Sequence, residues 1–256
     1  MIISGILGHP LKNPRSIKIW KKYFKKNNIR SKMEKFDIVP KNLPKFFHFI
    51  KKERNFKATA VTMPYKKEVL KYLDDVDEFA KKAGAVNLII KKRKKLIGYN
   101  TDLYGAFNSI KNEITKFDRI IIIGLGGTGQ AIFKYLSSRY KNIEFVLISK
   151  KYKIKKKSKK IQILNKIHSK ILFKPALIIN CSPLGSDLKK RFIKKTPIKK
   201  EFVDNINSSS FVFDIIYSPK KTIFSKICKQ NKLKYLNGLK MNTLQAFRAL
   251  ELAFGK

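Results

Sequence analysis

The stretch DRIIIIGLGGTGQ, residues 118–130, decides the fold that we predict for this chain. Its first half is a continuous apolar run, which is typical of a strand buried on both faces of a parallel sheet. A glycine-rich turn in the pattern G-x-G-x-x-G follows and leads into a helical segment: Gly124-Leu125-Gly126-Gly127-Thr128-Gly129. In that pattern the first glycine permits the tight turn, the second lets the backbone approach a pyrophosphate, and the third lets the helix pack on the strand. Because the helix N-terminus also presents free N–H groups to phosphates, the stretch predicts a dinucleotide-binding unit in which residues 124–128 contact the cofactor.

The end of the next predicted strand, over residues 143–149, indicates which dinucleotide is bound. An NAD site usually places Asp or Glu there, to accept hydrogen bonds from the ribose hydroxyls. This chain has Ser149-Lys150-Lys151 instead. The missing acid and the cations favour a 2′-phosphate, so we predict NADP as the cofactor, bound in part by these three residues. Lysine is common throughout the chain, so the missing acid is the stronger evidence.

Strands and helices alternate on both sides of this stretch. Further buried strands are predicted over 175–183 and 210–219, with a helix after them, which indicates a doubly wound parallel sheet. The first hundred residues also alternate between strand and helix patterns, with a hairpin over 86–100. The predicted fold class is therefore α/β with two domains. Residues 1–102, completed by a C-terminal helix over 238–256, form a β/α substrate-binding domain, and residues 103–237 form a Rossmann-type NADP-binding domain.

The charge of the chain is strongly positive, with 59 lysines and arginines against 17 aspartates and glutamates and a formal net charge of +42. Nucleic-acid recognition needs a focused basic patch, whereas here lysine is spread over every segment. It is accompanied by abundant Ile, Asn, Phe and Tyr, so compositional drift explains it better. We expect no specific nucleic-acid partner, only weak adsorption to polyanions that is sensitive to salt.

Several other classes are excluded by what the sequence lacks. No apolar stretch approaches the roughly 18–20 residues that span a bilayer, and the N-terminus does not resemble a signal peptide, so we expect no membrane partner. Two cysteines and three scattered histidines do not suggest a disulfide framework or a metal site. A reducing, cytoplasmic location fits this composition.

Six short motifs, in order along the chain, resemble those of the shikimate dehydrogenase family. The resemblance covers nearly the whole length of this chain. Two of them, Gly-Ala-Val-Asn and Gly-x-Asn-Thr-Asp-x-x-Gly, are intact at 84–87 and 98–105. The family's Asn-Val-Thr-x-Pro-x-Lys appears as AVTMPYK at 60–66, and its Ile-Asn-x-Thr-Pro-x-Gly as INCSPLG at 179–185. Its Asp-x-x-Tyr-x-Pro and its C-terminal helix are matched by Asp214, Tyr217 and Pro219, and by Gly238-Leu239-Lys240-Met241 with Gln245 and Phe247.

The resemblance implies that Lys66 is the catalytic acid/base residue, Asp102 its partner, and Lys67 a solvated neighbour. Reduction of a ketone to an alcohol needs a proton as well as a hydride, and a positioned lysine can supply it. The alternative is structural: Lys66 would be a surface residue after a turn, and Asp102 would cap a helix that starts near Tyr104.

The resemblance also implies two further groups of residues. Polar side chains that suit a polyhydroxylated ring would bind the substrate: Ser16, Thr62, Asn87, Tyr217 and Gln245. Positions near the nicotinamide or its ribose would be Glu78, Ile215, Gly238 and Met241. Four of the substrate residues have an ordinary structural alternative: Thr62 as a strand residue, Asn87 as a turn residue, Tyr217 as a core residue and Gln245 as a helix-surface residue.

The chain departs from the family at the end of the site that binds the substrate carboxylate. In the opening motif, Gly8 to Ile17, only Ser16 remains of two serines, because Pro14 replaces the other. Ala60 replaces the Asn before Val-Thr. Either Lys12 or Arg15 binds the carboxylate instead, or the enzyme acts on a different cyclic hydroxy acid, such as quinate or an amino-substituted analogue.

The function that we predict is NADPH-dependent, reversible reduction of 3-dehydroshikimate to shikimate, in chorismate and aromatic amino acid biosynthesis. Two alternatives remain open: a relative acting on another ring acid, and a non-catalytic nucleotide-responsive or polyanion-binding protein. The expected partners are small molecules, and a homodimer is compatible with the sequence.

Overall fold

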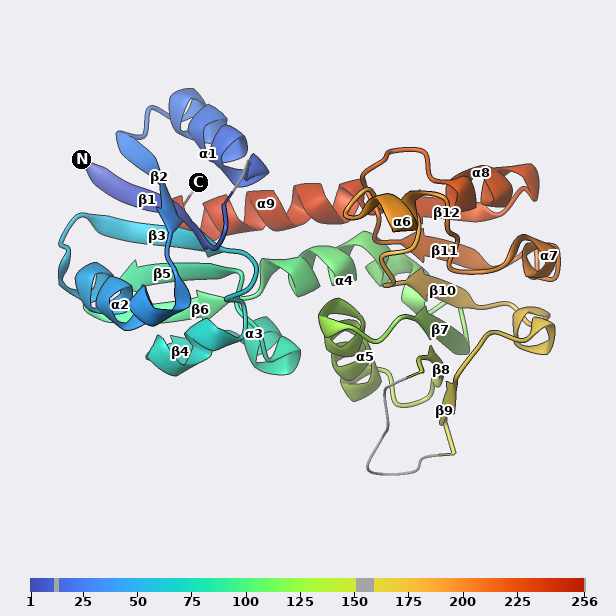
Figure 1. Cartoon of the computed structure of the whole chain (residues 1–256). Helices are drawn as coiled ribbons and strands as arrows, with labels where there is room; N and C mark the ends of the chain where they lie inside the picture. The colour runs from blue at the N-terminus through green and yellow to red at the C-terminus, as the bar shows by residue number, and fades with distance from the viewer. Residues whose placement is uncertain (12–13, 151–158, 256) are drawn as a thin grey trace. The chain divides into compact units, whose positions relative to one another are not determined.

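The computed structural model describes residues 1–11, 14–150 and 159–255 (Figure 1). Lys12, Lys151 and the side chain of Arg15, all named above, lie outside the described residues. The chain divides into two compact units, the first made of residues 1–105 with 243–256 and the second of 106–242. Both boundaries fall inside helices, namely α4 (Thr101–Ile114) and α9 (Leu239–Phe254).

The first unit is built on a mixed six-stranded sheet with the order β2-β1-β3-β5-β6-β4. Strand β1 is parallel to β2 and β3, whereas β5 is antiparallel to β3 and β6, which confirms the expected hairpin. The strands are β1 (Ile2–Gly8), β2 (Ser31–Asp37), β3 (Phe56–Val61), β4 (Asp75–Val76), β5 (Leu88–Lys92) and β6 (Lys95–Tyr99). The helices of this unit besides α4 and α9 are α1 (Arg15–Lys26), α2 (Leu43–Lys52), α3 (Glu78–Ala83) and two 3₁₀ turns, η1 (Pro40–Asn42) and η2 (Glu68–Tyr72).

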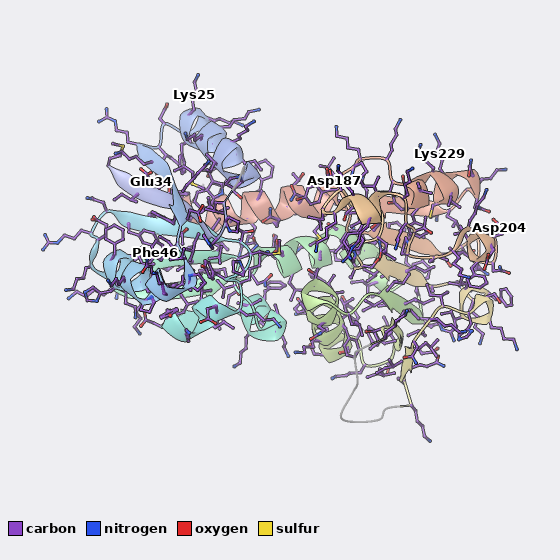
Figure 2. All side chains as sticks on the ribbon, in the orientation of Figure 1. Lys25, Glu34, Phe46, Asp187, Asp204 and Lys229 are labelled. Carbon is purple, nitrogen blue, oxygen red and sulfur yellow. The ribbon has the colours of Figure 1, made fainter. Side chains whose placement is uncertain are left out.

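Helices cover both faces of this sheet. Because successive residues of a strand point to opposite faces, neighbouring residues of β1 belong to different core clusters. Leu7 of β1 belongs to the core cluster that includes Phe46 and Ile50 of α2. Its neighbour Ile6 belongs to a second cluster, which includes Trp20 of α1 and Leu250 of α9. The side chain of Phe46 is accordingly buried, while Lys25 on the outer side of α1 is exposed (Figure 2).

The second unit is built on a six-stranded sheet with the order β12-β11-β10-β7-β8-β9, in which every neighbouring pair is parallel (Figure 1). This is the doubly wound order: β8 and β9 are added on one side of β7, and β10, β11 and β12 on its other side, so the switch point lies between β7 and β10. The strands are β7 (Arg119–Ile123), β8 (Glu144–Ile148), β9 (Ile161–Leu164), β10 (Leu177–Asn180), β11 (Phe211–Asp214) and β12 (Lys234–Asn237). Its helices besides α4 and α9 are α5 (Gly127–Arg139), α6 (Lys190–Ile193), α7 (Lys200–Val203), α8 (Ile223–Gln230) and the 3₁₀ turn η3 (Ser169–Leu172).

The central strands of this second sheet are apolar along their whole length because helices cover both of their faces. Ile120, Ile121 and Ile122 of β7 are fully buried, as the run in the sequence predicts. The short strand β9 was not predicted, since its four residues carry no long apolar run. The parallel sheet confirms the predicted α/β fold class.

No helix among the described residues is both long and apolar enough to cross a membrane. Exposed lysines occur on both units, for example Lys25 on α1 and Lys229 on α8 (Figure 2).

Candidate active site

Lys66 lies directly after the turn that ends strand β3. The turn closes through a hydrogen bond from Tyr65 N to Thr62 O (3.0 Å), and the buried Tyr65 side chain donates from its hydroxyl to Ile38 O. Lys66 itself accepts a backbone hydrogen bond from Val86 N (2.7 Å). These contacts hold the backbone of Lys66, so its long side chain starts from a defined position.

The side chain of Lys66 pairs with Asp102. Its Nζ lies 2.5 Å from Asp102 Oδ2, and the two side chains are 35% and 30% exposed. The residues are 36 positions apart in the chain, so the fold brings them together. Because the backbone of Lys66 is held and about one-third of each side chain is exposed, the ammonium and the carboxylate can contact a ligand as well as each other.

Helix α4 places Asp102 in its first turn, where the helix dipole favours a negative charge. The N-terminus is capped by Asn100, whose Oδ1 accepts a hydrogen bond from Leu103 N (2.8 Å). Asn100 Nδ2 donates to Ala85 O (2.8 Å). The structural alternative for Asp102 is therefore wrong: the helix begins at Thr101, and Asn100 takes the capping position.

A buried polar cluster stands beside this pair in sequence and in space. Asn87 Oδ1 accepts from Thr101 N (2.8 Å), and Asn87 Nδ2 donates to Thr101 Oγ1 (3.0 Å). Thr101 Oγ1 in turn donates to Gln245 Oε1 of α9 (3.3 Å). The structure thus joins two predicted substrate residues, Asn87 and Gln245, through Thr101, which precedes Asp102. Thr101 was not predicted as a site residue, although it is the central residue of the Asn-Thr-Asp motif.

The remaining predicted substrate residues of the first unit are less closely connected. Ser16 is half-buried in the first turn of α1, and Thr62 is half-buried at the end of β3. Neither makes a side-chain hydrogen bond to the cluster among the described residues. Pro14 occupies the N-cap position of α1 with an extended backbone and no capping side chain, and Ala60 is half-buried in β3. Both departures from the family therefore leave apolar groups where hydrogen-bonding side chains were expected.

Asp77 holds the backbone of Asn100, two residues before Asp102. Its Oδ1 accepts from Ala80 N (2.7 Å), which caps α3, and from Asn100 N (3.2 Å). Burial raises the pKa of the Asp77 carboxyl above its ordinary value, against the effect of these two N–H donors. Glu78, predicted near the nicotinamide, is the first residue of α3.

The glycine turn in the second unit fits a bound pyrophosphate. Gly124 has a positive φ of +88°, and a Cβ there would lie 2.8 Å from Ser182 N. A Cβ at Gly129 would lie 2.0 Å from Gly124 O, so helix α5 packs against the turn as only glycine allows. At Gly126 and Gly127, by contrast, an added Cβ would have no described atom within 4 Å apart from the adjoining residues of the turn and helix, so the backbone at the start of α5 is open to a ligand. Leu125 of the turn is buried, and Thr128 lies in the first turn of α5.

A pocket of about 500 Å³ opens at the carboxyl ends of the strands of this sheet. Apolar side chains, such as Ile148 and Phe202, form part of its wall, and none of the described residues that line it carries a carboxylate. Ser149 and Lys150 line it as predicted residues, and Lys166 and Lys199 join them from two other segments. The last two could not be predicted, since lysine is too common here to mark a site. Apolar walls and ammonium groups suit an adenosine that carries a 2′-phosphate.

Two of the residues predicted near the nicotinamide, Ile215 and Gly238, directly follow β11 and β12, whereas Glu78 begins α3 and Met241 lies in α9. Gly238 N donates to Ile216 O (3.0 Å), and a Cβ at Gly238 would lie 2.0 Å from Ile215 O. Tyr217 is half-buried in the same segment. No group of three or more His, Cys, Asp or Glu side chains in the described part of the chain is arranged to hold a metal ion.

These features define a class: an α/β, nucleotide-dependent oxidoreductase with a doubly wound sheet and a lysine–aspartate pair in a separate unit. Residues 6–89 match the family model for the shikimate dehydrogenase substrate binding domain. The chain is 37% identical over 253 residues to the shikimate dehydrogenase (NADP(+)) of Clostridium beijerinckii, with coverage of 97% of this chain and 90% of the relative. It is 33% identical to that of Clostridium botulinum strain Loch Maree, with coverage of 98% and 96%. The chain therefore belongs to the shikimate dehydrogenase family.

A solved structure gives the same result in three dimensions. A crystal structure of shikimate dehydrogenase in complex with NADP⁺ aligns with a TM-score of 0.82 and 27% identity, covering 100% of this chain and 90% of that one.

Proposed function

We propose that this protein is an NADP-dependent shikimate dehydrogenase, which reversibly reduces 3-dehydroshikimate to shikimate in aromatic amino acid biosynthesis. The Lys66–Asp102 pair, at 2.5 Å, is the observation that carries the proposal. It is supported by the relatives named above and by the nucleotide pocket.

The residues of the second unit would hold the cofactor. The open backbone at Gly126 and Gly127 suits the pyrophosphate, and Ser149 and Lys150 suit the 2′-phosphate and its ribose. When bound, the reduced cofactor supplies the hydride for the keto carbon. All other steps belong to side chains of this chain.

Lys66 supplies the proton. As the C=O double bond of the ketone opens and a C–H bond forms, an N–H of the Lys66 ammonium transfers its proton to the carbonyl oxygen, which becomes the alcohol. Asp102 accepts a hydrogen bond from Lys66 Nζ and thereby orients the ammonium. In the direction of oxidation, neutral Lys66 takes the proton back. Asn87 and Gln245, linked through Thr101, would bind ring hydroxyls.

The test compares Lys66→Ala with Lys67→Ala. Lys67 is the exposed neighbour of Lys66 in the chain, so it controls for the loss of one positive charge at this turn. General acid–base catalysis contributes roughly 10²–10⁴-fold, so kcat for shikimate oxidation with NADP should fall by about that factor in Lys66→Ala only. Equal rates in wild type and Lys66→Ala would refute catalysis by this lysine, and no turnover in wild type would favour a non-catalytic nucleotide-binding protein.

A second candidate activity is favoured by Pro14 and Ala60, which place apolar groups at the carboxylate end of the site. In it the same Lys66–Asp102 pair acts on another cyclic hydroxy acid, such as quinate. A panel of ring acids tests it: kcat/KM for quinate above that for shikimate would replace the first candidate with the second.

The cellular setting is part of the same proposal. We expect a cytoplasmic enzyme whose partners are its cofactor and ring acid, without a specific nucleic-acid partner. The homodimer stays a prediction, which light scattering tests.

A further inference from the structure

One buried carboxylate in the second unit has no cation beside it. Asp214, the last residue of β11, is fully buried. No lysine or arginine among the described residues forms an ion pair with it, although the chain carries 59 of them. An unpaired buried charge is costly, so its presence calls for a reason other than fold stability.

Neutral donors hold Asp214 instead. Its Oδ1 accepts from Asn180 Nδ2 (2.9 Å) and from Ile216 N (3.1 Å), and its Oδ2 accepts from Tyr235 Oη (2.8 Å). Asn180 Oδ1 then accepts from both Ser182 N (3.0 Å) and Ser182 Oγ (2.7 Å). We call this chain of contacts, Ser182–Asn180–Asp214–Tyr235, the polar ladder. Asn180 and Asp214 are the last residues of β10 and β11, and Tyr235 is the second residue of β12. The ladder therefore spans three strands that are neighbours in the sheet, as the order of β10, β11 and β12 in Figure 1 shows.

The ladder leads to the segment that the nicotinamide side of the site requires. Asp214 holds Ile216 N, and Ile216 O in turn accepts from Gly238 N (3.0 Å). Ile215 N donates to Asn180 O (3.1 Å). The backbone of Ile215 also approaches Gly238 so closely that no side chain fits there. The Asp214 carboxylate is thus the side chain that holds Ile216 N, while the backbone of Asn180 holds Ile215 N and Ile216 O holds Gly238 N.

Burial raises the pKa of the Asp214 carboxyl, while its hydrogen bonds from Ile216, Tyr235 and Asn180 act in the opposite direction. Burial raises the pKa of the Cys228 thiol to about 12, and the charge of Asp214 acts in the same direction. Asp214 is the acceptor around which the other groups are arranged.

We propose that Asp214 is a positioning residue for the dehydrogenase reaction: through the polar ladder it holds residues 215–217 against Gly238. The inference rests on the proposed function, because the family resemblance behind that function implies that Ile215 and Gly238 contact the cofactor and Tyr217 the substrate. Asp214 itself touches neither.

The experiment compares three variants of the full chain. Asp214→Ala removes the acceptor of Ile216 N, whereas Asp214→Asn keeps an oxygen in the place of Oδ1. The matched control is Ser210→Ala, at the opposite end of the same strand: Ser210 is fully buried and its Oγ accepts from Ala176 N (3.1 Å). The control also leaves a buried N–H, that of Ala176, without its acceptor, but at the amino-terminal ends of β10 and β11, whereas Asn180 and Asp214 lie at their carboxyl ends.

Three readouts are measured. The first is kcat with NADP and shikimate. The second is the Kd of 2′,5′-ADP by calorimetry, since the pocket of about 500 Å³ is lined neither by Asp214 nor by residues 215–217, and only Ser182 of the ladder lines it. The third is hydrogen exchange at the amides of Ile216 and Gly238.

A misplacement of about 1 Å can cost on the order of 100-fold in rate, so we expect kcat to fall about 10- to 100-fold in Asp214→Ala. Asp214→Asn should recover most of that loss, and 2′,5′-ADP should bind all variants alike. Exchange at Ile216 should accelerate in Asp214→Ala but not in Ser210→Ala.

Unchanged exchange at Ile216 in Asp214→Ala would overturn the inference, as would equal losses of kcat in Asp214→Ala and Ser210→Ala. An inactive wild-type protein that still shows the exchange difference would refute the proposed function and keep Asp214 as the anchor of residues 215–217.

Discussion

Asn100 offers the sharpest test of how the fold positions the acid/base pair. Its side chain makes two hydrogen bonds that hold the start of α4, one from Leu103 N to Oδ1 and one from Nδ2 to Ala85 O, both 2.8 Å. Asp102 lies between Asn100 and Leu103 in the chain, in the first turn of the helix. Loss of the cap should therefore loosen the residue that orients Lys66.

The magnitude follows from the two contacts. Replacing an Asn N-cap by Ala costs about 0.5–2 kcal/mol. The second bond adds about 1 kcal/mol, the low end for a lost partner, because Ala85 is only half-buried and its carbonyl reaches water. Asn100→Ala should thus lower the free energy of unfolding of the first unit by about 1.5–3 kcal/mol. Asn100→Ser keeps a good N-cap and loses only the bond to Ala85, so it should cost about 1 kcal/mol.

The assay is urea unfolding followed by tryptophan fluorescence. The single tryptophan of the chain, Trp20, is buried in the core of the first unit, so the signal reports that unit. The same variants are assayed for kcat, which should fall about tenfold or more in Asn100→Ala and little in Asn100→Ser. Equal unfolding free energies for the two variants would refute the capping role of Asn100. A kcat of Asn100→Ala equal to that of wild type would show that the cap is not needed for catalysis.

Three other predictions concern separate parts of the structure. Burial raises the pKa of Asp77 in the folded state above its unfolded value of about 4, so the protein loses stability as the pH rises from about 4 through the raised pKa. Relative to wild type, Asp77→Asn should therefore gain stability as the pH rises above about 4, measured by the same fluorescence. Gly129→Ala places a Cβ 2.0 Å from Gly124 O and should lower the melting temperature. Gly127→Ala meets no described atom within 4 Å beyond its neighbours in the helix, so it should weaken NADP binding and leave the melting temperature unchanged; equal melting temperatures for the two variants would contradict the packing role of Gly129. Lys150→Met should reduce kcat/KM for NADP about 10- to 100-fold, the equivalent of one charged hydrogen bond, and leave that for NAD unchanged; a parallel loss for both would show that Lys150 does not bind the 2′-phosphate.

The α/β fold class and the family could be predicted from the sequence because both depend on local patterns. The isoleucine run before Gly124 can be satisfied only by a strand buried on both faces, and the structure confirms β7 in the centre of a parallel sheet. Short strands such as β4 and β9 escaped prediction, since two to four residues are too few for a pattern. Their pairing is determined by neighbouring strands instead.

The candidate site could be predicted only as a set of residues, and their roles stay predictions. Lys66 and Asp102 were named together because of the family motifs, since nothing in either segment points to the other. Lys166 and Lys199 were missed because lysine marks no particular place in this chain. Asp214 was recognised as part of a motif, but its isolation from every described cation was not.

What the sequence determined by itself is the order of strands and helices, the glycine turn and the absence of an acid after β8. These are local properties: each depends on a few consecutive residues and on the backbone conformations open to them. What only the tertiary structure decided is which distant side chains meet, such as Lys66 with Asp102, and Asp214 with Asn180 and Tyr235. The physical reason is that such contacts depend on strand register and helix packing, which the whole core fixes at once and no single segment encodes.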